Sequence, residues 1–183
     1  MTKKILALIF FTGLVSSIGV LTKPPQTQVS RSDCITKTEE RTVRGDSMAG
    51  VLEEGDKVKI AFGFYNCHNI ERRDLVVYQF TQSEVLIKRV HGVPGDRFSL
   101  RKMSDGYWRL IINGDIQKTS EWREYLFDEN TKKILSLYED SYHGIIPDDA
   151  YLILGNVATG SVDSTRFGLV GRGDIVAKVI VDK

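Results

Sequence analysis

Short apolar, β-branched runs separated by turn residues are the feature that most limits what this chain can fold into. Runs of this kind are typical of strands, and alternation of apolar with polar residues indicates a strand with one buried face. The candidate strands cover residues 57–62, 74–80, 84–90, 150–154 and 174–182. The sequence therefore predicts a mainly β domain.

A second group of candidate strands lies between residues 97 and 118. An Asp-Gly and an Asn-Gly dipeptide divide it, and both dipeptides readily adopt the positive φ angles of tight hairpin turns. We expect this group to form a β-rich insertion. Residues 121–139 differ, because they are charged and carry apolar residues at helical spacing, which predicts an irregular or partly helical segment.

The N-terminus holds a long uncharged apolar segment, residues 5–21, behind Lys3 and Lys4. As a helix it would reach about 26 Å, slightly short of a bilayer core of about 30 Å, so length does not separate a retained anchor from a removable signal. The lysines favour a cytoplasmic start and export of the remainder. The predicted divisions are a cytoplasmic N-terminus at 1–4, a transmembrane anchor or signal segment at 5–21, a spacer at 22–40 and a folded domain at 41–183.

Charge and cysteine content argue against several classes of protein. The formal net charge is +1, so we expect no nucleic-acid partner held by phosphate attraction. Cys34 and Cys67 are the only cysteines and lack metal-ligand spacing, so we expect no zinc site. We also expect no other metal and no organic cofactor. In an exported domain the pair permits a disulfide, although the sequence contains no distance between them.

Ser47 is the candidate nucleophile, because it ends a short potential strand just before a turn-rich passage. A serine hydroxyl needs a base before it attacks a carbonyl at a useful rate. His68, His91 and His143 lack the surroundings expected of a Ser-His-Asp enzyme, and residues 45–49 miss the last glycine of the G-x-S-x-G turn. We interpret the three histidines as surface or packing residues.

Lys88 is the better candidate for the base. In a strand over residues 85–90, Leu86, Lys88 and Val90 share one face. An ammonium among aliphatic side chains loses hydration, which lowers its pKa, and the neutral amine can then accept the proton of Ser47. The alternative is a lysine whose stem follows the strand edge while its head stays in water.

Several motifs occur in an order that resembles type I signal peptidases. They are Gly45-Asp46-Ser47-Met48, Gly55-Asp56-Lys57-Val58, Lys88-Arg89-Val90-His91-Gly92-Val93-Pro94-Gly95-Asp96, Gly155-Asn156 and Ser161-Val162-Asp163-Ser164. The resemblance spans nearly all of residues 41–183. It implies a signal-peptidase/LexA-like β-sheet fold with an N-terminal membrane helix, in a serine endopeptidase that removes signal peptides from exported preproteins. The catalytic domain would lie on the periplasmic or extracellular side of the cytoplasmic membrane, with lipid as a further partner.

The resemblance also implies a role for individual residues. Ser47 would be the nucleophile, with its backbone N–H donating to the oxyanion, and Lys88 the general base. Ser161 matches the serine that hydrogen-bonds the lysine, and Asp163 with Ser164 matches a supporting polar cluster. In the remaining positions, Gly45 stands where some relatives carry a second oxyanion donor, and we expect Met48 and Leu86 to contact substrate.

Departures from the family pattern keep other functions open. Ala49-Gly50-Val51 replaces x-Pro-Thr, Gly155-Asn156-Val157 replaces Gly-Asp-Asn, and Thr165 replaces an arginine. A specialised relative that processes pilin-like or secretion substrates is therefore an alternative. Two alternatives come from other classes: a LexA-like self-cleaving regulator, which would be expected to carry a DNA-binding module, and an exported binding protein without catalysis.

Overall fold

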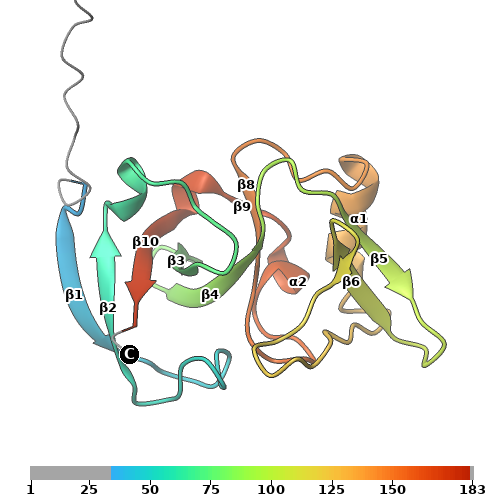
Figure 1. Ribbon diagram of the computed structural model, residues 1–183, viewed down its shortest axis with the longest axis horizontal. Coiled ribbons are helices and arrows are strands. Elements are labelled where there is room, and N and C mark those ends of the chain that lie inside the picture. Colours follow the sequence, from blue (N-terminus) through green and yellow to red (C-terminus); the bar gives the residue numbers. More distant parts are fainter. Residues whose placement is uncertain (1–33, 182–183) are drawn as a thin grey trace, which may run out of the picture.

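The computed structural model describes residues 34–181, and these residues form two parts that lie side by side (Figure 1). One part is built on a seven-stranded sheet and the other on a three-stranded sheet. The strands are β1 (Lys37–Thr42), β2 (Lys57–Phe62), β3 (Leu75–Gln79), β4 (Val85–Gly92), β5 (Phe98–Lys102), β6 (Trp108–Ile112), β7 (Asp115–Ile116), β8 (Ala150–Leu154), β9 (Val170–Gly171) and β10 (Ile175–Ile180). The helices are α1 (Lys133–Ser141), α2 (Ser164–Phe167) and the 3₁₀ turns η1 (Phe64–Asn66) and η2 (Arg172–Asp174). The mainly β fold that the sequence predicts is confirmed.

The large sheet has the order β1-β2-β10-β3-β4-β8-β9, and all of its pairs are antiparallel. Period-two alternation explains its two faces, because buried and half-buried residues alternate along β10. One face packs a core that includes Val58, Ile60 and Val179, and the other face packs a core that includes Val90 and Ile153. The sheet is therefore covered by apolar side chains on both sides.

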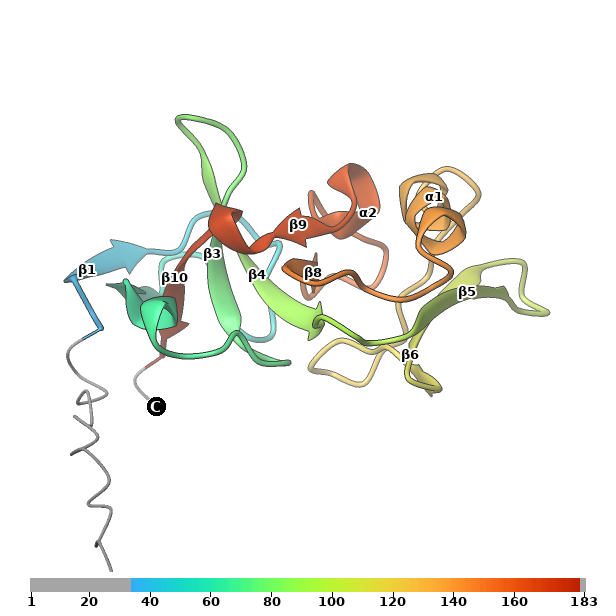
Figure 2. The same cartoon turned by 90° about the horizontal axis from the view of Figure 1, so that it is seen from above.

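Strand β4 joins the two parts of the molecule. Its first half pairs with β3, in a register that places Lys88 opposite Val76 and Leu86 opposite Tyr78. Pairing with β8 begins only at Arg89. Residues 85–88 consequently keep one strand edge free of any partner strand within the described part of the chain. In Figure 2 the turn between β3 and β4 projects away from the rest of the large sheet.

The second part contains β5, β6, β7 and α1 around a separate apolar core. That core includes Phe98, Leu110, Phe127 and Leu135, and it extends to Leu152 and Leu154 of β8. The turn between β6 and β7 has the geometry its Asn-Gly dipeptide predicts, with positive φ at both residues. The β-rich insertion is present, and the partly helical segment expected at 121–139 contains the start of α1 at Lys133.

The spacer boundary differs from the sequence prediction. We expected a solvated spacer through residue 40, but β1 begins at Lys37 and pairs with β2 along its whole length. Charged residues at four of its six positions, with threonines at the other two, hide the strand character of this edge strand from a hydrophobic pattern. The predicted membrane helix at 5–21 lies outside the described residues. None of the helices within residues 34–181 is long and apolar enough to cross a bilayer.

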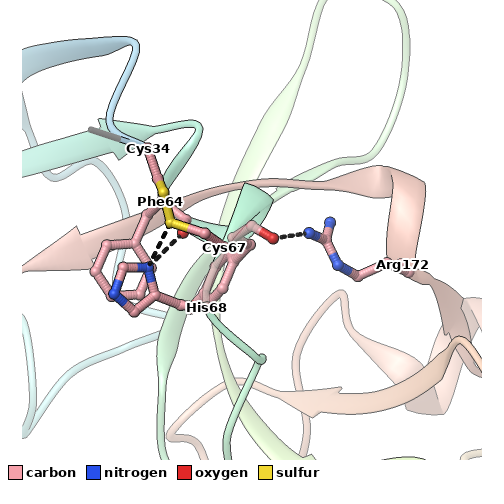
Figure 3. The surroundings of a disulfide bond; sticks show 6 residues. Cys34, Phe64, Cys67, His68 and Arg172 are labelled. Carbon is pink, nitrogen blue, oxygen red and sulfur yellow. Dashed lines mark hydrogen bonds between the residues drawn. A yellow bond between two sulfur atoms is a disulfide. The ribbon is translucent and has the colours of Figure 1, made fainter. Parts of the chain in front are cut away.

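A disulfide joins the chain ahead of β1 to the turn after η1 (Figure 3). It pairs Cys34 with Cys67, whose Cα atoms are 6.0 Å apart, and so confirms the pairing that the cysteine count permitted. His68 stacks on the Phe64 ring beside it, and its Nδ1 lies 2.8 Å from the Phe64 carbonyl. The disulfide therefore ties the first described residues to the main sheet.

Candidate active site

A tight loop after β1 carries Ser47 to the edge of the large sheet. Ala49 N–H donates to the Asp46 carbonyl at 2.9 Å, and Leu52 N–H donates to the Met48 carbonyl at 2.9 Å. Met48 is 2% exposed and Leu52 is 1% exposed, and both pack into the core on one face of the sheet. These two anchors hold the loop down, while the half-buried Ser47 side chain lies next to β4.

Lys88 reaches Ser47 from the middle of β4. Its Nζ lies 2.8 Å from Ser47 Oγ and 3.1 Å from the Ile87 carbonyl oxygen. The lysine is only 2% exposed, so burial lowers the pKa of its amine, and the nearby Asp163 carboxylate partly offsets that by raising it. An uncharged amine at this distance can accept the Ser47 proton directly.

Asp163 organises the polar groups around this pair. Its side chain is 1% exposed and accepts hydrogen bonds from Ser161 Oγ at 2.7 Å and from Gly155 N–H at 3.0 Å. Thr165 donates to the same carboxylate twice, through its backbone N–H at 3.0 Å and its hydroxyl at 2.8 Å. Neutral donors thus satisfy the carboxylate, and Thr165 supplies two of them at the position where an arginine is usual.

Comparison with known proteins places this chain in a family. The family model for signal peptidase, peptidase S26, matches residues 33–182. The chain belongs to the signal peptidase S26 family. It is therefore a serine endopeptidase of the type I signal peptidase kind, and the recognition made from its motifs is confirmed.

This chain is similar to several individual signal peptidases. Signal peptidase IB of Staphylococcus aureus (strain COL) is 28% identical over 145 residues, which cover 75% of this chain and 73% of that protein. Signal peptidase I of Bacillus caldolyticus is 30% identical over 140 residues, covering 75% of this chain and 74% of that protein. A crystal structure of a signal peptidase I from Enterococcus faecalis V583 superposes with a TM-score of 0.43 at 21% identity, over 62% of this chain and 98% of that one.

Two supporting serines in this signal peptidase make contacts that the motifs did not reveal. The resemblance implied that Ser161 hydrogen-bonds Lys88, but its hydroxyl donates instead to Asp163. Ser164 is fully buried, and its Oγ accepts the backbone N–H of Ile153 at 2.9 Å. Ser164 therefore fixes β8 against α2, and Ser161 bonds the carboxylate whose charge raises the Lys88 pKa.

The other predicted residues differ in their exposure. Met48 is part of the core, so little of its surface is open to a substrate. Leu86 is half-buried on the free stretch of the β4 edge, two residues before Lys88. Gly45 has φ of 76°, in the left-handed region that favours glycine, and no atom lies within 4 Å of a Cβ built there. Backbone conformation thus explains the glycine.

Sequence reasoning missed a set of residues that brace the nucleophile loop. Asn156 is 2% exposed, and its Nδ2 donates to the Ala49 carbonyl at 2.6 Å and to Ser120 Oγ at 2.8 Å. Its Oδ1 accepts the Ser120 N–H at 2.8 Å, so the amide uses both ends. The motif at Gly155-Asn156 draws attention to Asn156, but nothing in the sequence indicates that Ser120 lies beside it.

His91 is also placed by the fold. It is 8% exposed, and burial lowers its pKa to about 4, which keeps the ring neutral near pH 7. Its ring nitrogens lie 3.1 Å from Gln117 Oε1 and 3.3 Å from the Tyr125 hydroxyl. The prediction of a packing role fits this histidine, which lies outside the Ser47–Lys88 contact.

Within residues 34–181, one group of side chains has the residue types and the spacing that could hold a metal ion. The ligand atoms of Cys34, Cys67 and His68 lie within 4.8 Å of one another. The two sulfur atoms are bonded to each other, which removes the thiolates that a metal would need.

Proposed function

We propose that this enzyme removes signal peptides from exported preproteins through a Ser47–Lys88 dyad while it is held at the membrane. The single observation that carries the dyad is the 2.8 Å contact between Ser47 Oγ and a lysine Nζ buried away from water. Membership of the signal peptidase family supports the substrate class.

The proposed reaction begins with proton transfer from Ser47 to neutral Lys88. The freed Oγ attacks the scissile carbonyl carbon, and the ammonium that forms then protonates the departing amine, which leaves an acyl-enzyme. A water molecule next attacks the ester carbonyl and gives its proton to the same amine. Ser47 recovers its proton from Lys88 as the carboxylic acid product leaves, and the product then ionises by releasing a proton to water.

An oxyanion donor is available at the nucleophile itself. Within residues 34–181 the backbone N–H of Ser47 has no hydrogen-bond acceptor, so it is free to donate to the carbonyl oxygen as negative charge develops. A donor of this kind contributes about 3–4 kcal/mol to transition-state stabilisation in a serine protease. The negative charge of Asp163 would stabilise the Lys88 ammonium between the two proton transfers.

Substrate would bind as an added strand along the free edge of residues 85–88. That edge lies next to Ser47, and its backbone groups can hold an extended peptide of varied sequence. Leu86 is half-buried there and would contact an apolar side chain of the substrate. Specificity for small residues near the cleaved bond would then depend on the shallow space between this strand and the nucleophile loop.

The membrane attachment is proposed from the apolar segment 5–21. The Cys34–Cys67 disulfide supports a location for the domain outside the cytoplasm, because such bonds persist in oxidising compartments. A membrane anchor formed by residues 5–21 would confine the enzyme and the membrane-bound preprotein to one surface. Protease added to intact spheroplasts should digest the folded domain if this orientation is right, and protection of the domain would contradict it.

The deciding experiment uses the full chain in detergent micelles with a purified preprotein. Parent enzyme, Ser47→Ala and Lys88→Met are compared, and the new N-terminus of the product is sequenced. We expect cleavage at the signal-peptide boundary by the parent alone. Equal cleavage by Ser47→Ala would refute the dyad, cleavage restricted to pilin-like substrates would favour the specialised relative, and cutting only of the enzyme itself would favour a self-cleaving regulator.

A further inference from the structure

One peptide group connects the nucleophile to the second part of the molecule. It joins Gly155 to Asn156, directly after β8. Its N–H, which belongs to Asn156, donates to the Ser47 carbonyl oxygen at 2.7 Å. Its carbonyl, which belongs to Gly155, accepts the Tyr125 hydroxyl at 2.6 Å. Because a peptide unit is planar and rigid, a shift at the Tyr125 end moves the group that holds Ser47.

The position of this peptide group is set from several sides. Gly155 N–H donates to Asp163, and a Cβ at Gly155 would lie 2.6 Å from the Ser47 carbonyl oxygen. The backbones are therefore packed together with no intervening side chain. Tyr125 is the side chain that bonds the outer end of the group, and the 2.6 Å distance marks it as a short hydroxyl hydrogen bond.

Tyr125 is itself firmly held. It is 1% exposed and belongs to the core of the second part, where it packs edge-on against His91 and beside Phe127. The hydroxyl thus projects from one core toward the backbone next to the dyad. A buried hydroxyl that bonds a buried carbonyl is costly to remove, because the carbonyl is left without a donor.

The neighbours of Tyr125 determine where its proton goes. Gln117 Nε2 donates to the Asp115 carbonyl at 3.0 Å, which leaves its Oε1 facing His91 and requires His91 Nδ1 to donate. The neutral ring then presents Nε2 as an acceptor 3.3 Å from the Tyr125 oxygen. The Gly155 carbonyl is 0.7 Å nearer, so the hydroxyl proton is directed to it.

We propose that Tyr125 is a positioning residue for the nucleophile, acting through the Gly155–Asn156 peptide group on Ser47. The proposal rests on the function proposed above, because it assigns to Tyr125 the task of holding Ser47 at its distance from Lys88. It also gives the second part of the molecule a role in catalysis, since that part supplies the tyrosine. No contact between Tyr125 and substrate is required.

The test is Tyr125→Phe in the full chain, with Tyr65→Phe as the matched control. Both tyrosines are buried and donate one hydroxyl hydrogen bond, but Tyr65 donates to the Asp74 carboxylate and not to the Gly155–Asn156 peptide group. Single-turnover and steady-state cleavage of a preprotein are measured at a temperature where circular dichroism shows both variants fully folded. Amide hydrogen exchange at Asn156 is measured by NMR on the same samples.

We expect Tyr125→Phe to lower kcat about tenfold while KM changes less than about twofold, because a small displacement of reacting atoms is enough for such a loss. Exchange at the Asn156 amide should quicken in the same variant. Tyr65→Phe should lower thermal stability without either effect. A kcat for Tyr125→Phe equal to that of Tyr65→Phe would overturn the proposal, whatever the stability.

Failure of the underlying function is distinguishable. If cleavage by the parent does not depend on Ser47, the dyad is refuted, and the amide exchange still reports whether Tyr125 holds the peptide group. If cleavage depends on Ser47 but neither kcat nor Asn156 exchange responds to Tyr125→Phe, the dyad stands and the positioning role is refuted.

Discussion

Replacing Gly155 by alanine should disable catalysis while leaving the fold intact. The Gly155 backbone does not adopt a positive φ, so an alanine is acceptable conformationally and the effect is purely one of space. The added Cβ would lie 2.6 Å from the Ser47 carbonyl oxygen and 3.0 Å from Ser161 Cβ, and it would overlap Ser161 Oγ. Ordinary contacts begin at 3.4 Å, so the Ser47 backbone must move by about 0.8 Å, the difference between the two distances.

A displacement of that size acts directly on the reacting atoms. A misplacement of about 1 Å costs about a hundredfold in rate, which corresponds to about 2.7 kcal/mol in the barrier. We therefore expect kcat of Gly155→Ala to fall about a hundredfold in single-turnover cleavage of a preprotein, with KM little changed, because the free edge of β4 is not altered.

The matched control for this variant is Gly173→Ala. Gly173 also lacks a positive φ, and a Cβ there meets no atom within 4 Å. The control should cleave at the parent rate and unfold at or slightly above the parent temperature, since alanine reduces the entropy of the unfolded chain. A Gly155→Ala enzyme within about threefold of the parent would show that the 155–156 backbone does not hold Ser47 in its reactive position.

Three further predictions concern stability and pH. Replacing Cys34 and Cys67 by serine removes a cross-link between residues 33 positions apart, which should lower the free energy of unfolding by about 3–4 kcal/mol in a urea titration. The kcat per folded molecule should not change, and unchanged stability would contradict the prediction. Asn156→Asp places an acceptor against the Ala49 carbonyl oxygen and should lower the free energy of unfolding by about 1–3 kcal/mol in the same assay. A rise in the free energy of unfolding would contradict this role for Asn156. The ratio kcat/KM should fall as acid protonates Lys88, whose pKa is lowered by burial. Asp163→Asn removes the charge that raises the Lys88 pKa, so the acid side of the pH profile should move to lower pH. Movement to higher pH would refute the assignment of Lys88 as the base.

Much of the strand layout could be predicted from local pattern. β2 and β8 begin and end at the predicted residues, and β4 contains Lys88 where the apolar alternation placed it. The exceptions are the two-residue strand β9 and the strand β1, whose charged residues occupy an edge stabilised by pairing with β2. An edge strand of this kind carries little hydrophobic periodicity, so its position depends on backbone pairing that no local pattern records.

The sequence predicted the two reacting residues of the candidate site, but not the contacts that hold them in place. Ser47 and Lys88 could be proposed from residue chemistry and ordered motifs. The donors to Asp163, the bracing by Asn156 and the contact from Tyr125 could not, because each depends on which backbone groups the fold brings within hydrogen-bond distance. Ser161 illustrates the limit, since its hydroxyl donates to the carboxylate and not to the lysine.

The sequence by itself determined the class of fold, the turn positions, the family and the two residue types needed for amine-assisted serine chemistry. Those properties follow from period-two alternation, glycine conformations and side-chain chemistry, which are local. Only the tertiary structure decided that Ser47 and Lys88, 41 residues apart, lie 2.8 Å from each other with the amine buried. It also brought Tyr125 to the Gly155 carbonyl across 30 residues, because packing of two separate cores, unlike periodicity, sets distances between remote segments.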